Sequence, residues 1–258
     1  MHVKKITAFV GSARRKHTYD AVVQFVSNLQ AMGEIETEIV RLSDYQLQTC
    51  RGCKLCCDKG EEYCPLKDDR DVLLEKMMAA DGVIFASPNY SFQVSALMKT
   101  FLDRLGFAFH RPRFFGKTFT SIVAQGIYGG DKIVSYLDFV GKGLGFNTVK
   151  GNCIVTLEPM TEKQQQKIDR SLAAQARQYH ARMERPSYPV PALFQLMLFR
   201  LSRTKMKLEL DDTFRDFKYY AEKGWFDSDY YYPIRLGLFK AGAGKFFDWM
   251  SARLSKAR

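Results

Sequence analysis

Short apolar segments that alternate with amphipathic segments of helical periodicity constrain the fold of this chain more than any other feature. Five segments have the length and apolar character of buried strands: Val3–Val10, Ile35–Leu42, Gly82–Ala86, Lys117–Ala124 and Asn147–Leu157. Five more have the periodicity of helices: Asp20–Met32, Asp68–Ala80, Val94–Phe107, Asp131–Leu144 and Thr161–Met183. Strands that are joined through helices run parallel. The pattern therefore predicts an α/β fold, a three-layer doubly wound parallel five-stranded sheet with strand order 2-1-3-4-5.

The alternation stops near residue 184, and the composition changes beyond it. We expect residues 1–184 to form one domain, with a cysteine-rich loop over residues 44–67. A proline-containing segment, Arg185–Pro191, begins a helical, aromatic and basic C-terminal extension over residues 185–258. We expect this extension to pack on the main domain or on a second subunit. Contact with a membrane surface is the alternative.

Composition narrows the class of protein. The chain is 46% hydrophobic and 26% charged, as is typical of soluble globular proteins, and no apolar run is long enough to cross a bilayer. Because the N-terminal segment is typical of a first strand and not of a signal peptide, we expect a cytoplasmic protein. In that compartment six cysteines indicate ligands or free thiols, not disulfides. The net charge of +11 favours anionic partners, but no motif indicates nucleic-acid binding.

The loop after the first strand has the features of a phosphate site. Open α/β sheets bind ligands beyond the carboxyl ends of their strands, and a helix N-terminus offers amide donors to an anion. The Gly11–Thr18 loop adds the hydroxyls of Ser12 and Thr18, the forked donor of Arg14 and the ring of His17. An ordinary basic loop capped by Thr18 is the alternative.

Two further loops at the same edge of the sheet suit a planar ligand. After the third strand, Pro88, Asn89, Tyr90, Ser91 and Phe92 combine a fixed turn, polar donors and rings that can stack. After the fourth, the loop from Gln125 to Gly130 contains glycines that let the backbone approach a ligand closely: Gly126, Gly129 and Gly130. Structural turns are the alternative for both loops.

The cysteine run indicates a soft-metal site. Cys50, Cys53, Cys56 and Cys64 follow the spacing C-x2-C-x2-C-x7-C. Four such thiolates commonly hold a [4Fe–4S] cluster. Zinc and reduced thiols are the alternatives. We expect the sixth cysteine, Cys153, to lie in the core.

These motifs occur in one order on one predicted sheet, and together they resemble the NAD(P)H-dependent FMN reductase and iron–sulfur flavoprotein family of the flavodoxin-like superfamily. The resemblance covers roughly residues 1–180 and is carried by four segments: GSARRKHTY from Gly11, the cysteine run with Lys67–Asp69, ADGVIFASPNY over Ala80–Tyr90, and SALMKTFLDR over Ser95–Arg104. The chain departs from the family pattern at Ala13, where proline is common, and at Lys16 and His17, which replace a glycine and an asparagine.

The resemblance implies that the chain binds FMN. It places Ser12, Arg14, His17 and Thr18 on the FMN phosphate. It places Pro88, Asn89, Tyr90 and Ser91 along the isoalloxazine ring, and Gln125 to Gly130 on the far side of that ring. The four cysteines of the run would bind a [4Fe–4S] cluster, as in iron–sulfur flavoproteins.

The implied activity is an oxidoreductase in which FMN accepts hydride from NADH or NADPH and passes electrons to a quinone, a flavin or another small acceptor. Association into a homodimer or homotetramer through the flavin-proximal face is also implied. No side chain stands out as a general acid or base, because the cofactor carries the chemistry. Two alternatives remain: a non-enzymatic electron carrier between protein partners, and a thiol or metal sensor without flavin.

Overall fold

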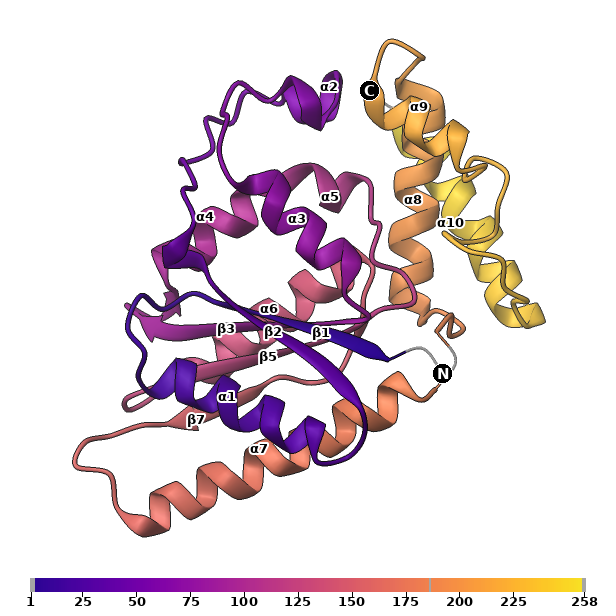
Figure 1. Cartoon of the computed structure of the whole chain (residues 1–258). Helices are drawn as coiled ribbons and strands as arrows, with labels where there is room; N and C mark the ends of the chain where they lie inside the picture. The colour runs from indigo at the N-terminus through magenta and orange to yellow at the C-terminus, as the bar shows by residue number, and fades with distance from the viewer. Residues whose placement is uncertain (1–2, 186, 257–258) are drawn as a thin grey trace. The chain divides into compact units, whose positions relative to one another are not determined.

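A computed structural model describes residues 3–185 and 187–256, and the chain divides into two compact units (Figure 1). The first unit comprises Met1–Cys50 and Leu66–Ser187, and the second comprises Arg51–Pro65 and Tyr188–Arg258. Most of the expected cysteine-rich loop thus groups with the C-terminal residues. Pro186, in the proline-containing segment, lies outside the described residues.

The first unit is built on a parallel sheet in the predicted flavodoxin-like order. Its strands follow one another as β2 (Ile35–Arg41), β1 (Lys4–Val10), β3 (Gly82–Tyr90) and β5 (Thr118–Gln125). Two short strands, β6 (Asn147–Thr148) and β7 (Asn152–Val155), both pair in parallel with β5. Together they occupy the place of the predicted fifth strand, so the fold class is confirmed.

A close approach of backbones interrupts that last strand at Gly151. A Cβ atom at this position would lie 2.0 Å from the Ser121 Oγ and 3.0 Å from the Ser121 carbonyl oxygen. The Gly151 amide instead donates to the carboxylate of Asp138 at 3.1 Å. Because this amide leaves the ladder, the segment forms two strands where the sequence predicts one.

Helices cover both faces of the sheet, and each face has its own chemistry. Aliphatic side chains of the strands pack against α1 (His17–Gln30) and α7 (Glu162–Met183) in one cluster. On the other face the rings of Phe9 and Phe85 contact Phe101 of α4 (Ala96–Arg104), with centroids 5.2 and 5.8 Å away. The remaining helices of this unit are α3 (Arg70–Ala79), α5 (Gly106–His110) and α6 (Gly130–Leu144), with the short η1 (Leu42–Asp44). The alternation of inward side chains along β1 produces the two faces.

Two differences from the expected helices affect the ligand-binding edge. Helix α1 begins at His17, three residues before the expected start at Asp20. The loop between β1 and α1 is therefore shorter than expected. The predicted helix Val94–Phe107 is two helices, α4 and α5, which meet at Leu105.

The second unit is helical, as expected for the C-terminal residues. It contains α2 (Leu55–Asp58), η2 (Glu61–Tyr63), α8 (Leu193–Glu209), α9 (Arg215–Glu222) and α10 (Leu238–Lys256). Arg200 of α8 donates to Asp248 of α10 at 2.8 Å and to Asp229 at 2.5 Å. No helix among the described residues is long and apolar enough to span a membrane.

Candidate functional site

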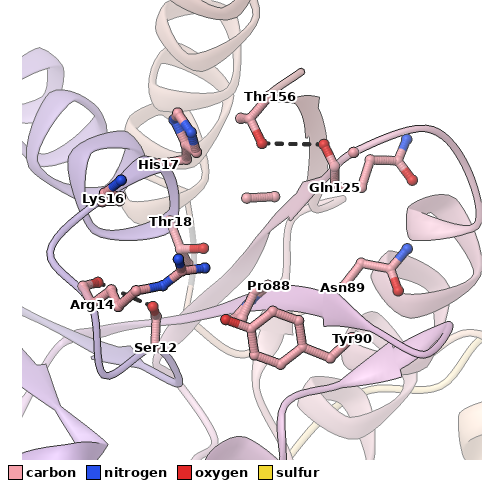
Figure 2. A pocket seen from close by; sticks show the side chains of 12 residues that line it. Ser12, Arg14, Lys16, His17, Thr18, Pro88, Asn89, Tyr90, Gln125 and Thr156 are labelled. Atoms are coloured by element: carbon pink, nitrogen blue, oxygen red, sulfur yellow. Dashed lines mark hydrogen bonds between the residues drawn. The ribbon is translucent and has the colours of Figure 1, made fainter. Parts of the chain in front are cut away.

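A pocket opens at the carboxyl ends of four strands of the first unit, β1, β3, β5 and β7 (Figure 2). It holds about 470 Å³ of space free of protein atoms, part of it open to solvent. Nine of the predicted cofactor-binding residues line it: Ser12, Arg14, His17, Thr18, Pro88, Asn89, Tyr90, Gln125 and Gly126. The parallel sheet gathers loops that are distant in sequence at this one edge.

Gly11 brings the first loop against the start of α4. Its amide donates to the carbonyl of Ala86 at 2.8 Å, and its carbonyl accepts the Ser95 hydroxyl at 2.5 Å. A Cβ atom at Gly11 would lie 2.8 Å from the Ser95 Oγ and 2.9 Å from the Met98 Cβ. A larger residue at this position would therefore push the loop away from the start of α4.

The end of the pocket beside α1 is rich in donors and positive charge. Lys16 precedes the helix, and its side chain makes no capping hydrogen bond, so the first amides of α1 keep their donor capacity. The Ser12 hydroxyl is buried and donates to the Arg14 carbonyl at 3.0 Å, which closes the loop. The guanidinium of Arg14 and the hydroxyl of Thr18 complete this wall (Figure 2). An anion with several oxygens is the matching ligand.

His17 lies at the pocket, but a carboxylate from another loop holds its ring. The Nε2 atom of His17 is 2.9 Å from the Oε1 atom of Glu158, and both side chains are partly exposed. Glu158 follows β7 and is separated from His17 by 141 residues. Sequence reasoning could not anticipate this contact, because neither residue belongs to a recognisable pair.

The loop predicted after the third strand is a tight hairpin. Strand β3 continues to Tyr90 and pairs antiparallel with β4 (Gln93–Val94). Ser91 and Phe92 form the two-residue turn with φ values of 50° and 62°. Such turns favour small residues, and a bulky ring at positive φ is rare and costs energy. Strained backbone of this kind clusters at binding sites.

Ser91 and Phe92 are therefore at the hairpin tip and not among the residues that line the pocket. The Phe92 ring contacts the Tyr128 ring with centroids 5.2 Å apart, and both rings are exposed. This contact ties the hairpin to the loop after β5.

Asn89 presents a polar atom that lacks a partner among the described residues. Its Nδ2 atom donates to the carbonyl of Tyr128 at 3.0 Å. Its Oδ1 atom is buried and accepts no hydrogen bond. Buried polar atoms are nearly always paired, so an orphan acceptor in a pocket wall indicates a ligand donor.

The loop after β5 is shaped by Gln125. The Gly130 amide donates to the Gln125 Oε1 at 2.6 Å, and the Thr156 amide donates to the Gln125 carbonyl at 2.8 Å. Gly129 has a φ of 92° and precedes α6. Gly129 and Gly130 thus support this wall from behind and do not line the pocket.

Three pocket residues were not predicted from the sequence: Lys16, Ala124 and Thr156. Thr156 comes directly after β7, so the rule that ligands lie beyond the carboxyl ends of strands would have indicated it. Its hydroxyl donates to the Gln125 carbonyl at 3.2 Å (Figure 2).

The predicted metal-binding cysteines are distributed over both units. Cys50 belongs to the first unit, and Cys53, Cys56 and Cys64 belong to the second. In the part of the chain that the structure describes, the thiols of Cys53, Cys56 and Cys64 do not gather as a set within 4.8 Å, as ligands of a single ion would. A cluster of several irons needs a wider spacing, so the cluster remains a prediction.

Within the first unit, two acidic side chains join the segment before the cysteine loop to the segment after it, and we call this junction the base of the loop. The Gln46 amide donates to the Asp69 carboxylate at 2.7 Å, and the Gln48 amide donates to the Asp68 carboxylate at 2.9 Å. Arg104 of α4 donates to Asp68 at 2.9 Å, and each of these two side chains is only 2% exposed. The loop therefore begins and ends on a fixed base.

The Asp68 carboxyl is strongly biased toward its charged form. Burial acts to raise the pKa of Asp68, but hydrogen bonds from Arg104 and from the backbone of Gln48 and Arg70 outweigh it, so the pKa lies below its ordinary value. The opposite holds for Cys153 in β7. Burial, followed by the charge of Asp131, raises the pKa of the Cys153 thiol to about 11. Cys153 is half-buried and a poor nucleophile at neutral pH.

Comparison with known proteins identifies the family to which the chain is similar. The model of the family described as NADPH-dependent FMN reductase matches residues 4–157. An iron–sulfur flavoprotein of Methanocaldococcus jannaschii is 40% identical over 100 residues, which cover 39% of this chain and 51% of the relative. An iron–sulfur flavoprotein of Archaeoglobus fulgidus is 35% identical over 146 residues, covering 55% of this chain and 64% of the relative. The match thus spans about half to two thirds of these relatives.

Solved structures agree in fold at low sequence identity. A flavone reductase superposes with a TM-score of 0.55 at 17% identity and covers 72% of this chain and 66% of its own. The structure of RosB with a bound 8-demethyl-8-formylriboflavin-5'-phosphate intermediate also has a TM-score of 0.55 at 17% identity, with 92% of each chain covered. These likenesses concern the fold alone.

Proposed function

Because the chain belongs to the NADPH-dependent FMN reductase family, we propose that its pocket binds FMN and that the protein is an FMN-dependent oxidoreductase. The observation that carries this proposal is the division of the pocket into two ends. One end combines a helix N-terminus with Arg14 and Lys16, and the other combines Asn89, Tyr90 and the loop after β5. A ligand with a phosphate at one end and a polar planar ring at the other matches both.

The residues beside α1 would hold the phosphate. Arg14 and Lys16 neutralise its charge, and the first amides of α1 donate to its oxygens, as helix N-termini do for anions. The Ser12 and Thr18 hydroxyls are already buried, so little ordering is needed when the ligand enters. Glu158 opposes this charge pattern, and its carboxylate lies 2.9 Å from the His17 ring.

The residues of the β3–β4 hairpin and the β5 loop would orient the ring. When bound, FMN supplies the capacity to accept a hydride and to pass electrons on, and the protein sets its position and surroundings. The free Oδ1 atom of Asn89 can accept a hydrogen bond from a ring N–H. The absence of a side chain at Gly126 lets backbone approach the ring edge.

We propose NADH or NADPH as the hydride donor and a quinone, a flavin or another small molecule as the acceptor. Two electrons and one proton leave the nicotinamide together, so the transfer to the ring needs no side-chain base. The titratable side chains among the described pocket residues are Arg14, Lys16, His17 and Tyr90, and none is a carboxylic acid. These pocket residues therefore support a role in positioning the flavin and its substrate, in preference to a role in acid–base catalysis.

We also propose that Cys50, Cys53, Cys56 and Cys64 hold a [4Fe–4S] cluster that exchanges single electrons with the flavin. The names of the similar archaeal proteins support this, as does the fixed base of the loop at Asp68 and Asp69. Chemical analysis of protein purified without oxygen tests it. Iron at about four atoms per chain supports the cluster, and flavin without iron contradicts it.

A homodimer or homotetramer that associates beside the pocket is a further part of the proposal. Four exposed apolar side chains flank the pocket mouth on the two loops: Tyr90, Phe92, Ile127 and Tyr128. Exposed apolar patches of this kind commonly mark interfaces. Analytical ultracentrifugation of the Ile127→Ser variant measures whether association depends on them. An unchanged oligomer would contradict this surface.

Titration of flavin-free protein with FMN and with riboflavin tests the main proposal. Riboflavin lacks the phosphate, so the Arg14→Ala variant should bind FMN about 10- to 100-fold more weakly, the loss of one charged hydrogen bond, and bind riboflavin as before. Lys163→Ala, an exposed cation on α7, is the matched control and should change neither affinity.

The activity itself is measured by adding NADH or NADPH to the FMN-bound protein in the absence of oxygen. Reduction of the flavin is then monitored as a loss of its absorbance. Rapid reduction supports the oxidoreductase. Tight FMN binding with no reduction by either nucleotide would favour an electron carrier. Failure to bind FMN would reject the site assignment.

A further inference from the structure

Helix α10 packs within the second unit through only one of its faces. Asp248 pairs with Arg200 and Arg203 of α8 at 2.8 and 2.6 Å. The Ser251 hydroxyl donates to the Leu201 carbonyl at 3.0 Å, and the Ser255 hydroxyl donates to Glu209 at 2.9 Å. With Gly244, which lies against Arg200, these residues follow one another at spacings of four and three. Such spacings define a single stripe along a helix.

The opposite face of α10 is an exposed aromatic stripe. Phe239, Phe246 and Trp249 are 76%, 53% and 55% exposed. With Gly242 and Arg253 they again follow spacings of three and four, about half a turn away from the packed stripe. Leu238, on the edge of this stripe, is 95% exposed. Large aromatic side chains seldom gather on a surface without a partner.

The segment that carries the aromatic stripe has a net positive charge, and two exposed cations, Lys245 and Arg253, lie on α10 with it. Residues 234–258 contain six Lys and Arg against a single acidic residue, Asp248, which faces inward. Lys245 and Arg253 are exposed, and the Arg253 guanidinium lies over the Trp249 ring at 5.4 Å. A second copy of the chain would oppose this charge with the same charge. An anionic surface complements it.

We propose that the aromatic stripe of α10, defined by Phe239, Phe246, Trp249 and Arg253, binds the surface of a membrane that contains anionic lipids. Aromatic rings are favoured at the boundary between headgroups and acyl chains, and Lys and Arg are attracted to anionic headgroups. The helix lies along the surface in this arrangement and does not cross it, in agreement with its length and polarity. The inference is independent of the proposed flavin chemistry.

Flotation of the full chain with vesicles tests the proposal directly. The protein should float with vesicles of phosphatidylcholine mixed with phosphatidylglycerol, float less with phosphatidylcholine alone, and be released by salt. The double variant Phe246→Ser, Trp249→Ser should bind at least tenfold more weakly, because two exposed rings no longer enter the interface. Lys245→Gln should lose about fivefold, which corresponds to about 1 kcal/mol for one cation.

A matched control and a spectroscopic reading locate the contact. Phe139 of α6 is 57% exposed, close to the value for Phe246, and Phe139→Ser should leave vesicle binding unchanged. The chain has two tryptophans, Trp225 at 5% exposed and Trp249 at 55%. Brominated lipid should therefore quench the wild-type fluorescence and not that of Trp249→Phe.

Three outcomes would overturn the proposal. The first is wild-type protein that does not float with anionic vesicles at low salt. The second is binding that persists at full strength in the Phe246→Ser, Trp249→Ser variant. The third is a wild-type oligomer that these two substitutions dissociate in the absence of lipid, which would assign the stripe to contact between copies of the chain.

Discussion

Replacing Asp68 with asparagine tests whether a buried ion pair holds the base of the cysteine loop. Asp68 accepts hydrogen bonds from Arg104 at 2.9 Å, from the Gln48 amide at 2.9 Å and from the Arg70 amide at 3.2 Å. Both charged side chains are 2% exposed. The substitution keeps the shape of the side chain and removes its charge from beside the guanidinium. It also points an amide donor at groups that are themselves donors.

The expected loss follows from the burial. Removing one partner of a buried ion pair costs about 3–5 kcal/mol, out of about 5–15 kcal/mol for a typical domain. For a unit of this size, 1 kcal/mol corresponds to about 2–4 °C in Tm, so we expect Tm to fall by roughly 6–20 °C. A loss of this size is readily measured by urea or thermal unfolding.

The loss should also depend on pH in a defined direction. Folding lowers the pKa of Asp68. A carboxyl whose pKa is lowered contributes stability above its unfolded pKa, near about 4, and that stability disappears as the pH falls through the folded pKa. The difference in unfolding free energy between the wild type and Asp68→Asn should be full at neutral pH and shrink below about pH 4.

Asp103→Asn is the matched control. Asp103 precedes Arg104 on α4 and pairs with Lys99 at the surface, where the two side chains are 45% and 48% exposed. Exposed pairs contribute about 0.2–1 kcal/mol, so this variant should unfold almost as the wild type does. The reasoning is refuted if Asp68→Asn costs no more than Asp103→Asn at neutral pH, or if its cost is independent of pH.

Other predictions concern the pocket wall and its thiol. Gly130→Ala would place a Cβ atom 2.4 Å from the Cys153 Sγ, so the free energy of unfolding measured in urea should fall by about 1–3 kcal/mol. At Gly106 an added Cβ meets no atom within 4 Å, so Gly106→Ala should be tolerated and serves as the control. The raised pKa should make Cys153 react with iodoacetamide at pH 8 about 100-fold more slowly in the native than in the unfolded protein, as followed by mass spectrometry. Glu158→Gln removes a negative charge beside His17, and FMN affinity should rise about two- to fivefold in a fluorescence titration. An unchanged or weakened affinity would mean that the phosphate lies elsewhere.

The sequence was enough to predict the pocket because strands, and the loops that follow them, can be recognised from short segments of the chain. Short apolar runs identify the strands, and the carboxyl ends of parallel strands must meet at one edge. The first loop, the hairpin residues Pro88–Tyr90 and Gln125 were therefore found without knowledge of any contact. The extent of β3 was underestimated, because Pro88 suggested a turn. In the folded sheet the same residue pairs with Ala124 of β5.

Contacts between distant residues could not be predicted in the same way. Asp68 and Arg104 lie 36 residues apart, and His17 and Glu158 lie 141 apart. Nothing in either local pattern identifies the partner, because a charged residue on a helix or in a loop is usually solvated. Only the packing of α4 against the loop base removes Asp68 and Arg104 from water.

Periodicity and motifs along the backbone were enough to predict the order of strands and helices, the sheet edge proposed to bind a ligand, and the family of the chain. The tertiary structure decided which of the predicted residues line the pocket and which support it. It also decided which face of α10 stays exposed, since apolar residues lie on more than one side of that helix and only packing selects the buried one. Burial is a property of the assembled elements, and a local sequence pattern specifies it only where one side of an element is apolar.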